Sequence, residues 1–378
     1  MSPAPAPALD LRHARVRSAC SALGLDALVV TSLPNIAYLA NFTGSAAIAV
    51  LLRDRLVLIT DFRYLTAIEE MRGTGFECAG LDLVRVESSY DQTLVGVLTS
   101  LGPVRIGFEA AHLTVSRFRW IEERLEGGAG ILVASEGVVE QARIVKDAWE
   151  VATLREAARR LSEAAREVVY EARPGRTERE VASRIDARLR DGGFQRNAFD
   201  TIVASGPNAA LPHARPGERT LTEGDLVVLD FGGVYDSYCV DLTRTVAVGA
   251  AGARARDVYA AVLDAHDRAI AAVSPGRLRF DVDEAARSTL AGRGLGDAFG
   301  HGTGHGLGLE VHEEPRIARR REGEVSGAAD RLVPGMVFTI EPGAYLPGWG
   351  GVRIEDDVVV TAEGVEVLTD VPTGLIEL

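Results

Sequence analysis

Short apolar runs and helically spaced apolar positions alternate along the first third of the chain. Apolar runs of four or five residues between polar or turn-forming residues predict strands, and apolar positions three or four residues apart predict helices. The expected strands cover 27–30, 48–52, 56–60, 105–108 and 131–134, and the expected helices cover 11–23, 64–71 and 114–126. This alternation is typical of an α/β domain, which we assign to residues 9–141.

The pattern changes after residue 141, where long helices begin. Asp147 with Glu150, and Thr177 with Glu180, have the spacing of a capping box. In this motif the first side chain accepts from a backbone N–H three residues later, and the acid reaches back to the first residue's N–H. Both pairs therefore predict the start of a helix.

Beyond Phe199 the chain is rich in predicted strands and contains a second helical pair, at 255–273 and 282–292. A helix pair followed by strand hairpins thus occurs twice, which indicates an internal duplication. Helices and strands grouped in this way are typical of an α+β domain. We assign this domain to residues 142–378.

One predicted hairpin carries two acids. Residues 226–229 form an uninterrupted apolar run, which predicts a strand buried on both faces that leads to Asp230. Turn-forming residues follow, so we expect Asp241 on the neighbouring antiparallel strand, roughly opposite Asp230. Two adjacent carboxylates are destabilising unless something lies between them. An exposed hairpin with two solvated acids is the alternative, which fits poorly after four apolar residues.

A second predicted hairpin repeats this arrangement. The apolar run 337–340 leads to Glu341, and after a glycine-rich turn the chain returns to Glu355. Again two acids are expected on neighbouring strands. Because Asp356 and Asp357 follow directly, a solvated acidic run is the alternative at this position.

Histidines gather between the two hairpins. His301, His305 and His312 all lie in one glycine-rich segment of twelve residues, and His213 lies further upstream. The glycines would let the backbone approach a ligand closely. A lone histidine is usually structural or solvated, but a histidine cluster in a chain with paired acids indicates a common site.

Together these patterns predict a dinuclear metal site. Four carboxylates buried without cations would lose hydration and repel one another, whereas two divalent ions would balance their charge. An oxygen-rich set with one imidazole suits Mn, Co, Fe or Zn, and two such ions can hold a hydroxide for hydrolysis. Nearby histidines and Arg353 could donate hydrogen bonds to a developing oxyanion. The expected ligands are Asp230, Asp241, His305, Glu341 and Glu355.

Composition narrows the possible partners. The chain has 378 residues and a net charge of −13, which argues against nucleic acid because phosphate binding needs basic surface. Three cysteines without CxxC spacing argue against a disulfide framework and fit a reducing cytoplasm. No apolar run approaches the ~20 residues that span a membrane. Residues 1–8 lack the pattern of a signal peptide, so we expect a disordered tail.

Four segments resemble the pita-bread metallopeptidases, a family that includes methionine aminopeptidase, aminopeptidase P and prolidase. They are LDFGGVYDSYCVDLTRT (229–245), HGTGHGLGLEVHEEP (301–315), GMVFTIEPG (335–343) and GVRIEDDVVV (351–360). The resemblance covers the C-terminal two-thirds of the chain and implies a pita-bread (creatinase/aminopeptidase-like) catalytic domain.

The N-terminal domain is similar to that of the Xaa-Pro peptidases, on the segments 35–39, 42–44 and 59–64. Methionine aminopeptidases generally lack such a domain, which argues against that subgroup. The resemblance implies a metal-dependent aminopeptidase P-like enzyme that cleaves before a proline at the second position. A dipeptidase of the prolidase type is the main alternative. A metal-free creatinase-like hydrolase or a binding module is disfavoured, because such proteins lose the ligands.

The resemblance also implies a role for each ligand. Asp230 would chelate one metal, and Asp241 and Glu355 would bridge both. His305 and Glu341 would hold the other metal, and Glu341 would also take the proton of the attacking water. Manganese is the expected metal, with Co, Zn or Fe as alternatives.

The remaining roles lie around the substrate. His213 and His312 would steady the scissile carbonyl and the tetrahedral intermediate, and Arg353 would support Glu355 or the substrate. Tyr38 would cap the site across the interface of a homodimer or larger homo-oligomer, and a packed aromatic residue is the equal alternative. The substrate-contact candidates are His301, Arg316 and Tyr38.

Overall fold

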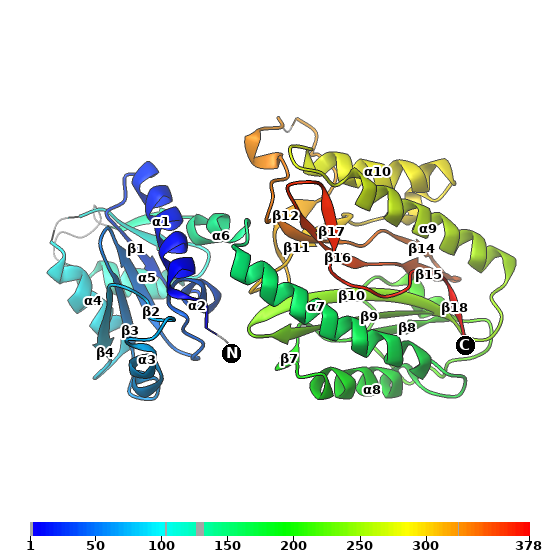
Figure 1. The fold of residues 1–378 in the computed structure, drawn as a ribbon, viewed down its shortest axis with the longest axis horizontal. Coiled ribbons are helices and arrows are strands. Elements are labelled where there is room, and N and C mark those ends of the chain that lie inside the picture. The colour runs from blue at the N-terminus through cyan, green and yellow to red at the C-terminus, as the bar shows by residue number, and fades with distance from the viewer. Residues whose placement is uncertain (1–2, 103, 126–131, 324) are drawn as a thin grey trace. The chain divides into compact units, whose positions relative to one another are not determined.

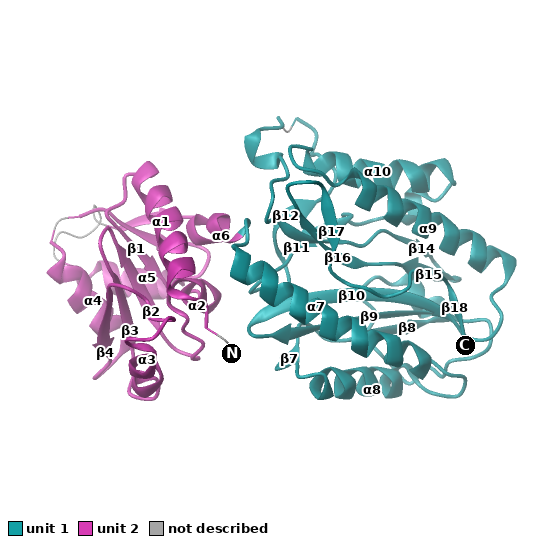
Figure 2. Ribbon diagram, viewed as in Figure 1, with its two compact units in different colours: residues 1, 144–378 teal, residues 2–143 magenta. Residues whose placement is uncertain are grey.

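The computed structural model describes residues 3–102, 104–125, 132–323 and 325–378. The chain forms two compact units, one ending at Arg143 and one beginning at Ile144 (Figure 2). We call them the N-terminal and the C-terminal unit. Among the described residues, no helix combines the length and the apolar composition needed to cross a membrane.

The N-terminal unit is built on a mixed sheet whose described strands run in the order β4-β3-β2-β1-β5-β6. Pairing is antiparallel within β1-β2-β3 and parallel at the remaining contacts. The strands are β1 (Ala27–Val30), β2 (Ile48–Leu52), β3 (Leu56–Thr60), β4 (Leu81–Arg85), β5 (Ile106–Glu109) and β6 (Leu132–Ser135). The helices are α1 (Ala6–Ala22), α2 (Leu33–Ala40), α3 (Leu65–Met71), α4 (Tyr90–Ser100), α5 (Val115–Glu122) and α6 (Val138–Arg143).

The expected α/β character of this unit is confirmed, and β1, β2 and β3 have the predicted bounds. The strand β4 was not predicted, because its side chains are only partly buried and its apolar run is interrupted. The predicted helix 114–126 ends at Glu122. Residue 126 and residue 131, the expected first residue of β6, lie outside the described residues.

The prediction of a disordered tail over residues 1–8 is wrong for its described part. Helix α1 begins at Ala6, with Pro7 in its first turn, where the fixed φ of proline suits a helix start. The backbone N–H and carbonyl of Ala4 both bond to the side chain of Asn41, at 2.9 and 2.8 Å. These contacts anchor the segment to its unit. Residues 1–2 lie outside the described residues.

The C-terminal unit contains two larger sheets and a hairpin. The first sheet has the strand order β18-β10-β9-β7, and β8 also pairs with β9. The second sheet has the order β12-β11-β13-β16-β17. The strands of the first sheet are β7 (Arg196–Asn197), β8 (Ile202–Ser205), β9 (Leu226–Tyr235), β10 (Tyr238–Ala247) and β18 (Ile376–Glu377). Those of the second are β11 (Gly304–Gly306), β12 (Glu313–Ile317), β13 (Val337–Ile340), β16 (Asp356–Val360) and β17 (Val365–Val367), and the hairpin is β14 (Gly343–Leu346) with β15 (Gly350–Arg353).

Helices cover this unit on both sides of its strands (Figure 1). The helix α7 packs on the sheet of β9 and β10, and α9 and α10 pack on the second sheet and the hairpin. This is the predicted α+β arrangement of helices and sheets. The helices are α7 (Ala148–Val168), α8 (Glu178–Asp191), α9 (Ala253–Ala272) and α10 (Arg279–Gly292).

Both predicted capping boxes are present. Asp147 accepts from the backbone N–H of Glu150 at the start of α7, and Thr177 accepts from Glu180 at the start of α8. In each case the glutamate side chain returns a hydrogen bond to the N–H of the capping residue. The two helices therefore begin where local side-chain chemistry satisfies their unpaired N–H groups.

Candidate metal centre

The strand register places the first acid pair on one face of the sheet. Thr243 lies opposite Asp230, and Asp241 lies opposite Gly232. Asp241 is thus two residues from the expected pairing. Because side chains alternate along a strand, this offset keeps both carboxylates on the same face.

The second acid pair lies at the end of a strand pair. Ile340 and Asp356 form the last pair of β13 and β16. Glu341 follows β13 directly, and Glu355 directly precedes β16. The alternative of a solvated acidic run at this position does not hold, since Asp356 and Asp357 are 2% and 0% exposed.

The glycines around His305 serve the packing of strands. A Cβ atom on Gly304 would lie 1.8 Å from the carbonyl oxygen of Thr339, and one on Gly306 would lie 2.2 Å from that of Glu314. No side chain fits at either position. The expectation that these glycines let backbone approach a ligand is therefore replaced by a different reason: they let β11 lie close to its neighbours.

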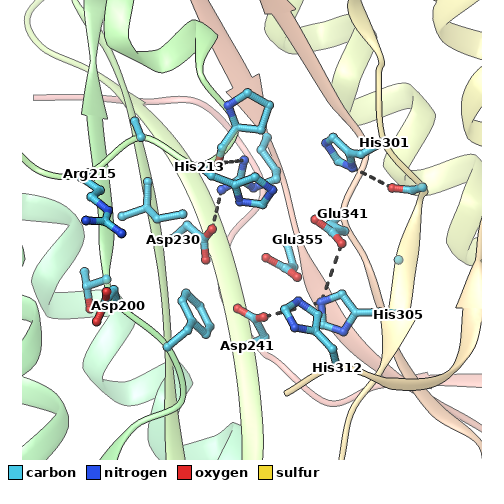
Figure 3. A pocket seen from close by; sticks show the side chains of 18 of the residues that line it. Asp200, His213, Arg215, Asp230, Asp241, His301, His305, His312, Glu341 and Glu355 are labelled. Atoms are coloured by element: carbon cyan, nitrogen blue, oxygen red, sulfur yellow. Dashed lines mark hydrogen bonds and ion pairs between the residues drawn. The ribbon is translucent and has the colours of Figure 1, made fainter. Parts of the chain in front are cut away.

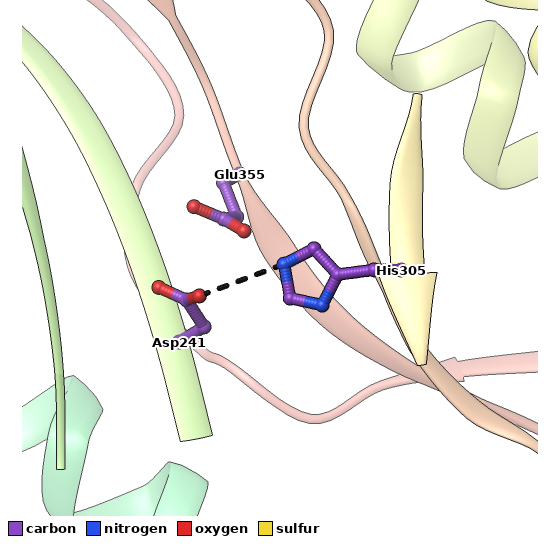
Figure 4. A group of neighbouring side chains, drawn as sticks. All are labelled: Asp241, His305 and Glu355. Carbon is purple, nitrogen blue, oxygen red and sulfur yellow. Dashed lines mark ion pairs between the residues drawn. The ribbon is translucent and has the colours of Figure 1, made fainter. Parts of the chain in front are cut away.

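Asp241, His305 and Glu355 each contribute one ligand atom to a group within 4.8 Å of one another (Figure 4). His305 Nε2 lies 3.9 Å from Asp241 Oδ2 and 3.8 Å from Glu341 Oε1. The Nδ1 atom of the same ring lies 3.0 Å from the carbonyl oxygen of Gly306. A proton on Nδ1 donated to this carbonyl leaves the Nε2 lone pair directed at the carboxylates, as in a metal-binding imidazole.

Burial dominates the electrostatics of the acid cluster. It raises the pKa values of Asp241 and Glu355 well above their ordinary range, and neighbouring carboxylates raise them further. The pKa of Asp230 is also raised by burial, although Arg353 opposes this, and the pKa of Glu341 rises to about 8. Burial lowers the pKa of His305 to about 4. Without cations the cluster would therefore hold protons and a neutral imidazole.

Two oxygens of the cluster have no hydrogen-bond partner. These are Oδ1 of Asp230 and Oδ1 of Asp241, both buried. Buried carboxylate oxygens without partners are rare in folded proteins, and a bound ion or an ordered water accounts for them. Four carboxylates, two of which have a partnerless oxygen, and one neutral imidazole nitrogen fit a site for divalent metal ions.

Arg353 lies beside this cluster at 3% exposure. Its guanidinium hydrogen-bonds to Asp230 and donates to the hydroxyl oxygens of Thr243 and Tyr345, at 3.2 and 2.8 Å. The carboxylate that Arg353 hydrogen-bonds is therefore Asp230, and its support of Glu355 or the substrate stays a prediction. Tyr345 links Arg353 to His301, whose Nε2 lies 2.9 Å from the tyrosine hydroxyl.

The cluster opens into a cavity of about 440 Å³ within the C-terminal unit (Figure 3). His312 lines it next to His305, with ring centroids 4.4 Å apart. The sequence-predicted residues that line it are Asp230, Asp241, His305, Glu341, Glu355, His213, His312, Arg353, His301 and Arg316.

Tyr38 belongs to the N-terminal unit. Its side chain is fully buried, its hydroxyl donates to the carbonyl of Ala142 at 3.1 Å, and the guanidinium of Arg12 covers its ring at 4.6 Å. These contacts agree with the alternative of a packed aromatic residue. Its contact with substrate stays a prediction.

Sequence reasoning missed several residues of the site. Asp357 accepts a hydrogen bond from the backbone N–H of Asp241 at 3.0 Å, and burial raises its pKa well above the ordinary range. The apolar run 358–360 was the available signal that this acid lies in a buried strand. Asp200 and Arg215 line the cavity from loops (Figure 3), where spacing gives no signal.

Two family models match the chain. Residues 152–362 match metallopeptidase family M24, and residues 12–145 match the creatinase/prolidase N-terminal domain. An uncharacterized peptidase of Bacillus subtilis, YqhT, is 38% identical over 96% of this chain and 99% of its own length. A Xaa-Pro dipeptidase of Pyrococcus furiosus is 41% identical over 62% of this chain and 65% of its own length.

Solved structures agree with these matches. The Xaa-Pro dipeptidase from Bacillus anthracis superposes with a TM-score of 0.90 at 36% identity, covering 98% of this chain and 100% of that one. The X-Pro aminopeptidase from Thermotoga maritima gives a TM-score of 0.84 at 33% identity, covering 96% and 100%. Both matches extend over nearly the whole length of this chain.

Proposed function

Since the chain belongs to metallopeptidase family M24, we propose that it is a metal-dependent Xaa-Pro peptidase. It would hydrolyse the bond between an N-terminal residue and a following proline. The observation that carries this proposal is the convergence of four carboxylates and His305 on one cavity. Similarity to both Xaa-Pro dipeptidases and an X-Pro aminopeptidase supports the substrate class.

The proposed cofactor is a pair of divalent ions, with manganese first and Co, Zn or Fe as alternatives. Asp230, Asp241, His305, Glu341 and Glu355 would hold them. When bound, such ions lower the pKa of a water molecule and polarise a carbonyl group. The partnerless oxygens of Asp230 and Asp241 support this assignment.

The chain's own residues would complete the reaction. Glu341 lies at the cavity and would accept the proton of the attacking water. His213 and His312 would donate hydrogen bonds to the carbonyl oxygen as it gains charge. Burial and nearby Arg316 lower the pKa of His312, which favours its neutral ring.

The length of the preferred peptide depends on the rim of the cavity. Arg215 and Arg316 line it, and among the described residues neither guanidinium has an ion-pair partner. A free proline carboxylate would complement such charges. This observation favours dipeptides as substrates, while similarity of the N-terminal segments to aminopeptidase P favours longer peptides. We therefore propose activity on Xaa-Pro dipeptides alongside Xaa-Pro-Yaa.

A cleavage panel with added Mn²⁺ tests the proposal. The peptides are Ala-Pro, Ala-Pro-Ala, a longer Xaa-Pro peptide and Met-Ala-Ser, with products read by mass spectrometry. We expect release of the first residue from the proline peptides and none from Met-Ala-Ser. Cleavage of Met-Ala-Ser alone would indicate a methionine aminopeptidase instead.

The resemblance further implies a homodimer or a larger homo-oligomer, and we propose this assembly as well. Size-exclusion chromatography with light scattering tests it directly. A mass of about 40 kDa at micromolar concentration would contradict it, since the chain itself has a mass of 40.3 kDa.

A further inference from the structure

Arg244 lies on the reverse face of the strand that carries Asp241. Along β10 the side chains alternate, so Asp241 and Thr243 face the acid cluster and Arg244 faces the opposite side. The guanidinium of Arg244 is among the most deeply buried charges of the C-terminal unit, with a side chain only 2% exposed. It lies outside the residues that line the cavity.

All five N–H donors of this guanidinium have acceptors. Nη1 donates to the carbonyl oxygens of Glu355 and Thr243, at 2.6 and 2.9 Å. Nη2 donates to Asp356 Oδ1 at 2.8 Å and to the carbonyl of Val371 at 2.7 Å, and Nε donates to Pro372 at 3.1 Å. One side chain thus joins β10, the start of β16 and the C-terminal segment.

The charge of Arg244 is balanced by Asp356. This carboxylate also accepts from the hydroxyl of Thr369 at 2.6 Å, and Nε2 of His266 lies 3.0 Å from its second oxygen. A buried ion pair seldom stabilises a protein more than well-packed apolar residues of the same volume would. Stability alone therefore does not explain the buried pair of Arg244 and Asp356. The hydrogen bond from Arg244 to the carbonyl of Glu355 does explain it.

Glu355 is held at three points. Its backbone N–H donates to the Thr243 carbonyl at 3.1 Å, and its own carbonyl accepts from Arg244. Its carboxylate accepts from the Thr243 hydroxyl at 2.6 Å. Arg244 donates to the backbone carbonyl groups of Thr243 and Glu355, and so holds the backbone at these two residues. A displacement there would move the Glu355 carboxylate out of the cluster.

We propose that Arg244 is a positioning residue for the Glu355 carboxylate. This role rests on the proposed function, because it requires Glu355 to be a metal ligand. Metal sites require ligands held within about 0.5 Å of the productive geometry, and loss of a residue that supports a ligand typically lowers metal affinity about 10–100-fold.

The test measures Mn²⁺ binding to the metal-free protein by calorimetry. Arg244→Lys keeps the charge but cannot reach five acceptors, and we expect it to weaken Mn²⁺ binding about tenfold or more. Tyr259→Phe is the matched control. The Tyr259 hydroxyl holds the same C-terminal segment by donating to the carbonyl of Thr373 at 2.7 Å, and it does not contact Glu355. It should leave Mn²⁺ affinity unchanged.

A double-mutant cycle separates positioning from general destabilisation. In a Glu355→Gln background, Arg244→Lys should change Mn²⁺ affinity no further, because the carboxylate it positions is gone. Additive losses would overturn the proposal, as would wild-type affinity in Arg244→Lys. Should Arg244→Lys fail to fold, Arg244→Gln combined with Asp356→Asn removes both charges of the pair and is measured in the same way.

The outcome for the wild-type protein keeps the two claims apart. A wild-type protein that bound no Mn²⁺, Co²⁺ or Zn²⁺ would overturn the proposed metal centre and this role together. A wild-type protein that binds Mn²⁺ while Arg244→Lys binds it equally well would overturn only the role of Arg244.

Discussion

At the scale of single residues, burial defines the acid cluster. Asp230 on β9 and Asp241 on β10 are buried on one face of their sheet, and each has one buried oxygen without a hydrogen-bond partner. The sequence predicted this pair because four apolar residues precede Asp230. Asp357 was not predicted, because acids that follow one another in sequence are usually solvated, although the apolar run 358–360 after it indicates the buried strand β16.

Asp241→Asn should remove metal binding, because an amide cannot supply the negative charge of a ligand that lies between neighbouring carboxylates. We expect metal affinity to fall by more than about 100-fold, the upper end for residues that merely support a ligand, and peptidase activity to fall with it. Metal content by elemental analysis checks this. Asp236→Asn, in the turn between β9 and β10, is the control and should keep both. Normal metal content in Asp241→Asn would show that Asp241 is not a ligand.

The metal-free protein should become less stable as pH rises from 6.5 to 8. A carboxyl group whose pKa is higher in the folded state stabilises the fold fully below its unfolded pKa and loses that contribution as pH rises through its folded pKa. For Glu341 this window runs from the ordinary 4.5 to about 8. The lowered pKa of His305 acts only below the ordinary value of 6.5.

Thermal unfolding after chelation measures this effect. Glu341→Gln should show a smaller fall in Tm over the same pH range, and Mn²⁺ should stabilise the wild-type protein more at pH 8 than at pH 6.5, because metal then replaces no proton. A Tm of the metal-free protein that rises from pH 6.5 to 8 would contradict the raised carboxyl pKa values.

At the scale of elements, apolar runs predicted strands well where both faces are buried. The strands β1, β2 and β3 are buried throughout and were found with their bounds. The strand β4 is half-exposed, so its apolar run is interrupted and does not predict a strand. The proline-rich N-terminus predicts a disordered tail, but proline also suits the first turn of a helix, and α1 begins there. The close packing that requires glycine in β11 could not be predicted, because it depends on neighbouring strands that no local sequence pattern identifies.

Gly304→Ala should destabilise the protein by about 1–3 kcal/mol, the usual result of overpacking, because its Cβ would collide with the Thr339 carbonyl. Chemical denaturation measures the loss. Gly300→Ala, four residues earlier, is the control, since its Cβ meets nothing within 4 Å. Equal stability of the two variants would mean that β11 can move away from β13 freely.

At the scale of the whole molecule, the sequence motifs predicted the fold of both units and the metallopeptidase family. They could not decide the length of the peptide, because Asp200 and Arg215 lie in loops of the cavity wall without a spacing signal. The preferred peptide length depends on which charged side chains of the cavity wall have no ion-pair partner in the folded chain.

Arg215→Ala and Arg316→Ala should raise KM for Ala-Pro about tenfold or more, the loss expected for a charge-assisted hydrogen bond. Ala-Pro-amide, which lacks the free carboxylate, is the matched substrate and should be affected little. Steady-state kinetics with both substrates checks this. An equal effect on the two would show that these arginines do not read the carboxylate.

The most direct measurement is the release of alanine from Ala-Pro-Ala and Ala-Pro by chelated protein that is then titrated with Mn²⁺. The account predicts no release in the chelated state and activity that rises until two Mn²⁺ ions are bound per chain. Full activity in the presence of a chelator, or none after reloading with Mn²⁺, Co²⁺ or Zn²⁺, would contradict a dinuclear Xaa-Pro peptidase.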